Sequence, residues 1–169
     1  DELGAPTTMS LAAARDAAAA VGAAVRAHAT SRAVLRDAGR AAASLARSAN
    51  GALALVEMGA ADAIVAILTA TALDLGDTAV LVNGCRALAA VAERAPAPWR
   101  PDAPLCALTL RALEMARADD AVPLLGYTLR LLTCVSEWCG SAPAREQRHV
   151  AVAIDELVAR GGAVRVVAA

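Results

Sequence analysis

Three arginines recur at nearly constant spacing and are the side chains in this sequence best suited to bind a ligand. Arg40, Arg86 and Arg130 stand 46 and 44 residues apart, each inside a stretch spaced as an amphipathic helix. The same positions of the repeat carry Asp37, Asn83 and Tyr127 three residues earlier, and Ser44, Ala90 and Cys134 four residues later. A guanidinium group presents a planar fork of donors that pairs bidentately with carboxylates. The pattern therefore indicates either a carboxylate-binding row or a solvated helix face, and we expect Glu93 and Glu137, each seven residues after an arginine, to neutralise part of it.

The other reactive residue types form no pattern that is typical of catalysis or metal binding. His28 and His149 fall in different expected helices and share no cysteine or carboxylate at metal-ligand spacing. The four cysteines have no CxxC spacing and sit in apolar helical stretches, so we expect reduced thiols: Cys85, Cys106, Cys134 and Cys139. No serine has GxSxG context, and no glycine-rich phosphate loop is present. We predict a protein that is not an enzyme, with no catalytic residue, metal, cofactor or small-molecule substrate.

The composition indicates a helical protein. The chain has 169 residues, about the length of one domain, and is 58% hydrophobic but only 2% aromatic, with no phenylalanine. Alanine, leucine, arginine and glutamate favour helices, whereas strands favour β-branched and aromatic residues. We therefore predict an all-α fold with a core of closely packed small side chains. The net charge of −1, with sixteen basic residues that are all arginine, argues against nucleic acid as the partner.

Residues 1–9 read as a flexible lead-in, and residues 10–169 as a single helical repeat domain. Apolar periodicity and capping residues predict helices at Ser10–Ala29, Arg32–Ser48, Ala52–Met58, Ala60–Thr71, Thr78–Arg94, Leu105–Arg117, Val122–Trp138, Arg145–Ala159 and Ala163–Ala169. Asn50 and Gly51 are expected to separate two helices, and Gly59 to form a turn. Residues 95–104 contain four prolines, which predicts an irregular linker, and Gly140–Pro143 is expected to be a loop.

Parts of this pattern repeat along the chain. The segment LVEMGAADAIV, which begins at Leu55, is matched 102 residues later by LVARGGAVRVV. Together with GCRALAAVA at residues 84–92, these segments resemble the armadillo repeat family, whose unit contains a turn of the form LVEAGAIPALVALL and a long helix ending AAWALSNIA. The resemblance covers residues 30–95 best, residues 120–169 less closely, and residues 1–29 as a preceding helix. It implies a right-handed α-solenoid of about three armadillo-type repeats plus an N-terminal helix, with HEAT-type repeats as the alternative.

The resemblance also carries an expectation about function. In peptide-binding armadillo proteins a tryptophan and an asparagine of the third helix line the concave groove; their places are taken here by Arg40, Arg86 and Arg130 and by Ser44, Ala90 and Cys134. With Asn83 and Tyr127 alongside, this face implies a non-catalytic protein–protein interaction module for a partner protein or acidic segment, not for basic cargo. The alternative is a structural scaffold subunit of a large assembly that uses its solenoid ends and the proline-rich linker. There Trp99 either folds back onto the core or protrudes as an interface anchor.

The remaining expectations concern the ends of the chain and its surroundings. No window reaches the ~20 uninterrupted apolar residues that a membrane-spanning helix needs. The chain opens without methionine and stops inside an apolar helix, so we expect a fragment of a longer solenoid whose end is covered by more chain, another copy or a partner. The thiols suggest an intracellular protein, most simply cytoplasmic, with nucleus, cilium and organelle interior left open.

Overall fold

The chain is an all-α protein. The computed structural model describes residues 9–75, 77–95, 99, 103–118 and 122–141, and these contain seven helices and no strand. The helices are α1 (Leu11–Ala27), α2 (Arg32–Leu45), α3 (Ala49–Glu57), α4 (Ala60–Leu75), α5 (Thr78–Arg94), α6 (Ala103–Ala118) and α7 (Val122–Ser141). The predicted helices at Arg145–Ala159 and Ala163–Ala169, and residues 1–8 of the expected lead-in, lie outside the described residues.

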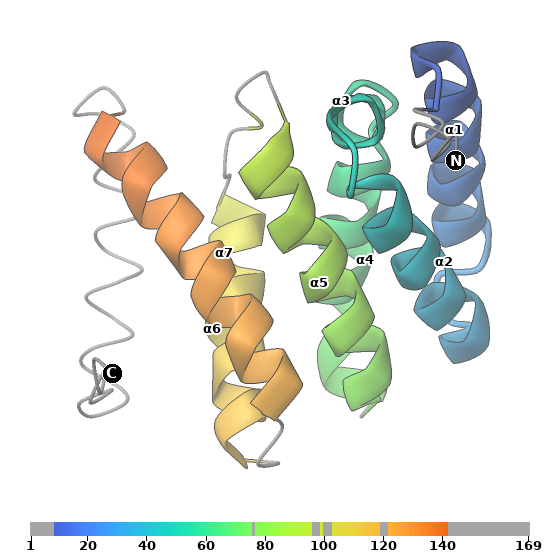
Figure 1. Cartoon of the computed structure of the whole chain (residues 1–169). Helices are drawn as coiled ribbons and strands as arrows, with labels where there is room; N and C mark the ends of the chain where they lie inside the picture. Colours follow the sequence, from blue (N-terminus) through green and yellow to red (C-terminus); the bar gives the residue numbers. More distant parts are fainter. Residues whose placement is uncertain (1–8, 76, 96–98, 100–102, 119–121, 142–169) are drawn as a thin grey trace, which may run out of the picture.

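The helices are arranged in two rows. In the front row of Figure 1, α5 packs against α2 on one side and against α7 on the other. In the second row α4 packs against α1 and α6, and the short α3 lies at the top of the view, between α5 and α1, against α1, α4 and α5. The front row therefore places the stretches around Arg40, Arg86 and Arg130 on three consecutive neighbouring helices.

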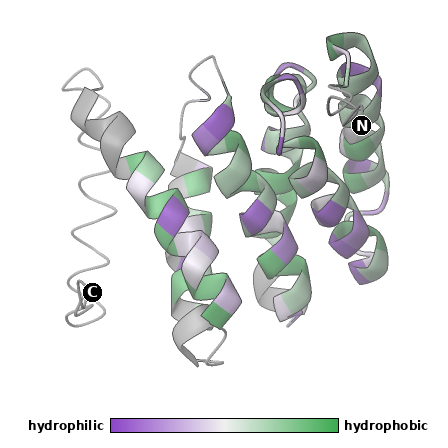
Figure 2. Ribbon diagram, viewed as in Figure 1, coloured by the Kyte–Doolittle hydropathy of each residue, from purple (hydrophilic) through white to green (hydrophobic). Residues whose placement is uncertain are grey.

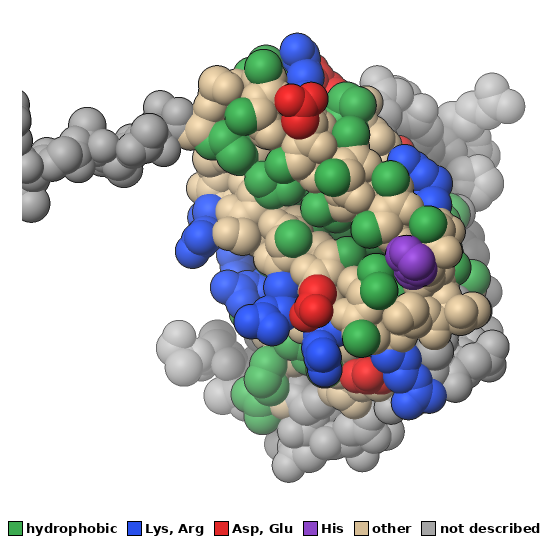
Figure 3. Space-filling model, turned by 90° about the vertical axis from the view of Figure 1, so that its right-hand side faces the viewer, with side chains coloured by type: hydrophobic (Ala, Val, Ile, Leu, Met, Phe, Trp, Pro, Cys, Tyr) green, Lys and Arg blue, Asp and Glu red, His purple; other side chains and the backbone are tan. Residues whose placement is uncertain are grey.

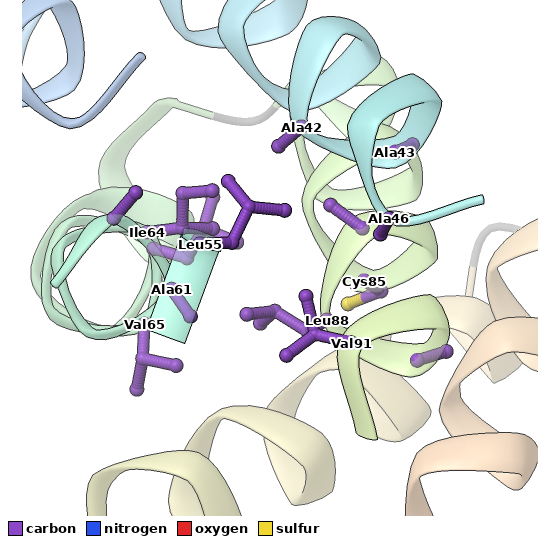
Figure 4. Packing of buried hydrophobic residues seen from close by; sticks show 14 of the residues in the cluster. Ala42, Ala43, Ala46, Leu55, Ala61, Ile64, Val65, Cys85, Leu88 and Val91 are labelled. Atoms are coloured by element: carbon purple, nitrogen blue, oxygen red, sulfur yellow. The ribbon is translucent and has the colours of Figure 1, made fainter. Parts of the chain in front are cut away.

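Small and branched aliphatic side chains fill the space between the rows. Figure 4 shows the alanines of α2 and residues such as Leu88 of α5 facing Leu55 and Ile64, which come from α3 and α4. Leu55 and Leu88 are fully buried. Figure 2 shows the same division by hydropathy, with hydrophilic positions on the front of α2, α5 and α7. Because the alanine side chain is small, the helix backbones can approach one another closely. The core is therefore filled by close helix contacts and not by large aromatic side chains.

Polar residues cap the first turn of two helices, α1 and α5. The Ser10 hydroxyl accepts a hydrogen bond from the backbone N–H of Ala13, and the Asp77 carboxylate accepts from the N–H groups of Ala79 and Val80. Both caps were expected from the sequence. Pro104 lies in the first turn of α6, as expected, where the missing N–H costs no helical hydrogen bond. α6 begins at Ala103, two residues before the predicted start, and residues 96–98 and 100–102 of the predicted linker lie outside the described residues.

The predicted break at Asn50 and Gly51 is wrong. Both residues lie inside α3, because Ser48 caps this helix by accepting a hydrogen bond from the Gly51 N–H at 3.1 Å. Asn50 instead donates its side-chain amide to the Met9 carbonyl at 3.2 Å, and Met9 itself packs on the core. The lead-in is therefore tied to the helical stack from Met9 onwards.

Several other boundaries also differ from expectation. α2 ends at Leu45, three residues early, whereas α4 continues to Leu75 and α7 to Ser141, so Gly140 is helical and not part of a loop. The predicted turn between α3 and α4 is confirmed: Gly59 has a φ of 64°, in the left-handed region that glycine adopts without steric cost. Among the described residues no single helix is long and apolar enough to cross a membrane, although α3 and the first part of α4, bent by 67°, pass by length and composition together.

Candidate functional site

The three repeated arginines lie on the three neighbouring helices of the front row. Arg40 is on α2, Arg86 on α5 and Arg130 on α7, and all three are exposed. Each is flanked in its helix by buried positions that pack inward, such as Cys85 and Ala87 beside Arg86. The amphipathic pattern of these helices therefore positions the arginines, since the apolar stripe that faces the second row turns the opposite side to solvent.

Arg130 is already bound by a carboxylate of the neighbouring helix. Its Nε and Nη2 atoms donate to Oε1 and Oε2 of Glu93 at 2.7 and 2.6 Å, a bidentate pair across α5 and α7. These hydrogen bonds hold the pKa of Glu93 below its usual value, against partial burial, which raises it. The Arg130 guanidinium also lies 6.0 Å from the centroid of the Tyr127 ring. Arg130 is thus the least available of the three arginines for an added ligand.

Glu93 was expected to neutralise part of the arginine row, and it does so through Arg130 of the next helix, whereas the side chain of Glu137 lies outside the described residues. It pairs with Arg130 on α7 and, at 3.2 Å, with its sequence neighbour Arg94. Arg86 forms no ion pair and no side-chain hydrogen bond with any residue that the structure describes. Within the described part of the chain, the unpaired arginine of the row is therefore the central one.

The arginines of α2 are weakly paired. Arg36 and Arg40 each approach the same carboxylate oxygen of Asp37 at 3.8 Å, and all three side chains are about half or more exposed. Exposed pairs of this kind contribute only about 0–1 kcal/mol. One carboxylate serving two guanidinium groups leaves α2 with a surplus of positive charge.

Ser44 and Asn83, both candidates from the sequence, have local partners. The Ser44 hydroxyl accepts a hydrogen bond from Arg47 Nη2 at 2.8 Å, which holds that guanidinium over the same side of α2. The Asn83 side-chain amide donates to the Ala79 carbonyl within α5 at 2.9 Å. We call the exposed surface formed by Arg36 and Arg40 of α2, Arg47 in the turn after α2, and Arg86 of α5 the basic face. In the view of the α1 and α2 end in Figure 3, basic side chains gather at the lower left, the side that corresponds to the front row.

The two parts of the basic face are held close together at one glycine. A Cβ atom on Gly39 of α2 would lie 3.1 Å from the Asn83 Cβ and from the Gly84 backbone nitrogen of α5. Any larger residue at Gly39 would push the helices apart, so this contact sets the separation of the α2 and α5 arginines.

Trp99 lies against the core. Its indole Nε1 donates to Asp62 Oδ1 of α4 at 3.0 Å, and the ring is half-buried against the hydrophobic cluster. Of the two arrangements expected for this residue, the structure has the one in which it folds back. Its role as an interface anchor stays a prediction, and the part of the ring left exposed is what a partner would contact.

Sequence reasoning found most of these residues but missed the pair between helices. Arg36 and Arg47 carry the local signal of a polar stripe on an amphipathic helix. Glu93 and Arg130 are 37 residues apart, and so are Asp62 and Trp99, so no local spacing connects them. The recurrence of the arginines at nearly constant spacing is the one sequence signal that relates α5 to α7, which pack against each other.

Pockets and metal-ligand clusters do not suggest a second site in the part of the chain that the structure describes. One apolar pocket between α1, α2, α4 and α5 has a volume of about 10 Å³, roughly the space of one water molecule. Its lining is Val25, Leu35, Gly39, Ile64, Ile67, Leu68, Val80 and Gly84, none of which titrates. Across the described residues no group of three or more histidine, cysteine or acidic side chains could hold a metal ion.

The arrangement is thus a surface of exposed guanidinium groups, which can bind carboxylates or other anions by hydrogen bonding and charge. Comparisons of this chain with protein-family models, with curated proteins and with solved structures give no match.

Proposed function

We propose that this chain is a non-catalytic protein-interaction module that binds an acidic segment of a partner protein on its basic face. In this proposal the helices form a short right-handed α-solenoid of armadillo type, with α3, α4 and α5 as one complete unit. Support comes from the two rows of helices and from the short α3 preceding the pair α4 and α5. HEAT-type repeats remain the alternative for the repeat class.

The single observation that carries the proposal is the state of Arg86. This side chain is exposed and has no anionic partner among the described residues, next to an α2 surface where Asp37 serves both Arg36 and Arg40. The whole chain has a net charge of −1, so the basic face is a local concentration of charge that the composition hides. A complementary acidic segment would supply the missing carboxylates.

The strength of exposed ion pairs determines the affinity and the salt dependence expected of such a site. Each exposed ion pair contributes about 0–1 kcal/mol, so a useful affinity requires several guanidinium groups to act together. Added salt should weaken the complex, because charges at the surface are screened over about 8 Å at physiological ionic strength.

The test is affinity capture from the source cell with wild type and an Arg40→Glu, Arg86→Glu double variant. Arg130 is left intact, because a glutamate there would face Glu93 and disturb the contact between α5 and α7. Arg26→Glu, which reverses one exposed arginine on α1 outside the basic face, is the control for charge reversal elsewhere on the surface. Circular dichroism checks that all variants are folded.

The proposal predicts that proteins with acidic segments are captured by wild type and Arg26→Glu and lost in the double variant. Equal capture by all three proteins would contradict it.

A scaffold subunit that uses the ends of the stack is the second candidate. Val122 and Leu129 of α7 favour it, because they are 70% and 40% exposed despite being large and apolar. Capture that survives the arginine changes but is lost with Val122→Ser and Leu129→Ser would favour this role.

A further inference from the structure

We infer that the acidic segment binds in an extended form across α2, α5 and α7, with carboxylates about three residues apart opposite α2 and α5 and an uncharged residue opposite α7. This inference rests on the proposed function and specifies the chemistry of its ligand. The observation behind it is the unequal occupancy of the three repeated arginines, since Arg130 is held by Glu93 whereas Arg86 is unpaired among the described residues.

The spacing follows from the packing of the front row. Neighbouring packed helices lie about 8–10 Å apart. An extended chain advances about 3.3 Å per residue. A segment that crosses the helices therefore moves from one to the next in about three residues, and a carboxylate that meets Arg40 on α2 is followed about three residues later by one that meets Arg86 on α5.

At α2 the resident carboxylate can be displaced. Asp37 contacts Arg36 and Arg40 through one oxygen at 3.8 Å each, with no hydrogen bond of ordinary length between them. Its side chain is 65% exposed, so water replaces these contacts when a ligand takes the guanidinium groups. A ligand carboxylate with bidentate geometry would be the better partner.

At α7, in contrast, the resident carboxylate of Glu93 is not readily displaced. Two donors of Arg130 are taken by the two oxygens of Glu93 at 2.7 and 2.6 Å, and the Glu93 side chain is only 28% exposed. A ligand carboxylate opposite α7 would approach the Glu93 charge and compete with a shorter, better aligned pair. An uncharged residue avoids this repulsion and lies beside Tyr127. The Glu93 charge therefore disfavours a third acidic residue at the point where the ligand crosses α7.

Labelled peptides of glycine, serine and threonine test this inference by fluorescence anisotropy. A two-acid peptide carries two aspartates three residues apart, and a three-acid peptide adds a third aspartate at the same interval. Further probes carry two adjacent aspartates or none. The proteins are wild type, Glu93→Gln, Glu93→Gln with Arg130→Gln, and Glu57→Gln, which removes one carboxylate that pairs with Arg15 away from the front row.

In wild type, the two-acid peptide should bind more tightly than the peptide with adjacent aspartates, and the third aspartate should add little, less than about twofold. In Glu93→Gln the third aspartate should tighten binding at least about threefold, because Arg130 is released. Glu57→Gln should not show this gain, and the additional Arg130→Gln change should remove it. Thermal unfolding confirms that each variant is folded.

The peptide experiment distinguishes failure of the inferred aspartate spacing from failure of the proposed function. An equal gain from the third aspartate in wild type and Glu93→Gln, or equal binding of adjacent and spaced aspartates, would overturn the inference and leave the proposed function standing. Binding of none of the acidic peptides would overturn the proposed function, and the inference with it.

Discussion

Glu93 on α5 and Arg130 on α7 are 37 residues apart in the sequence and form a bidentate ion pair that joins the two helices. A second pair between helices, Arg15 Nε to Glu57 Oε2 at 2.8 Å, joins α1 to α3. In both cases a carboxylate of one helix forms an ion pair with an arginine of another helix. The arginines that lack such a partner among the described residues remain available to a ligand, and this difference decides where the basic face lies.

The Glu93 to Arg130 pair should make a small, pH-dependent contribution to stability. Because the folded-state pKa of Glu93 is lowered by its hydrogen bonds to Arg130, the contribution is present above the unfolded-state pKa and lost as pH falls through the folded-state value. Glu93→Gln should lower the free energy of unfolding by up to about 1 kcal/mol at neutral pH. Urea unfolding from pH 7 to pH 3 should show the two proteins converging, whereas a difference that stays constant with pH would contradict this assignment.

Gly51→Ala should be strongly destabilising. A Cβ at this position would collide with the carbonyl oxygen of Leu45 and lie 2.6 Å from its carbonyl carbon, in backbone that cannot rotate away. We expect a loss of about 1–3 kcal/mol in the free energy of unfolding, as is typical of overpacking, despite the better helix propensity of alanine.

Gly126→Ala on α7 is the control for this change. Nothing lies within 4 Å of its added Cβ, so alanine should stabilise by about 0.5–1 kcal/mol. If urea unfolding gave equal changes in the free energy of unfolding for the two substitutions, the result would contradict the close contact between Gly51 and the Leu45 carbonyl.

Gly59→Ala should be destabilising for a different reason. Nothing lies within 4 Å of an added Cβ, so the cost comes from the φ of 64° alone and should be about 1–2 kcal/mol. Gly59→Asn should cost less, because asparagine tolerates the left-handed conformation. Thermal unfolding should rank the proteins as wild type, Gly59→Asn and Gly59→Ala, and a Gly59→Ala protein as stable as wild type would exclude this turn.

Cys85 should not react with alkylating agents in the native protein. Burial raises the pKa of its thiol to about 12, so almost no thiolate forms at pH 8, and the sulfur is fully buried between α2 and α5. Mass spectrometry after iodoacetamide treatment should find Cys85 unmodified until denaturant is added. Rapid labelling without denaturant would show that α2 and α5 separate readily.

Much of the fold could be predicted from local signals. The caps at Ser10 and Asp77 and the turn at Gly59 each depend on residues within a few positions of one another, and all three appear in the structure. The all-α class followed from a composition rich in alanine and leucine. The break predicted at Asn50 and Gly51 failed because a nearby serine, Ser48, caps α3 and keeps both residues helical.

The candidate site was less predictable, because its key feature is a contact between helices. The row of Arg40, Arg86 and Arg130 follows from the repeat spacing, but their different availability does not. That difference arises because the Glu93 side chain pairs with Arg130 of the next helix and not with Arg86 of its own. A shift of α7 by one residue along its axis would break this pair. Side-chain pairing at this level depends on packing, which the repeat pattern alone leaves open.

A titration of ¹⁵N-labelled protein with the two-acid peptide, followed by amide chemical shifts, shows directly whether an acidic segment binds at the basic face. Binding at the basic face predicts that the largest shift changes fall within residues 36–47, in α2 and the turn after it, and within residues 83–90 of α5. These changes should vanish in the Arg40→Glu, Arg86→Glu variant. Largest changes on α1 or α6, or changes that persist in the variant, would contradict the account.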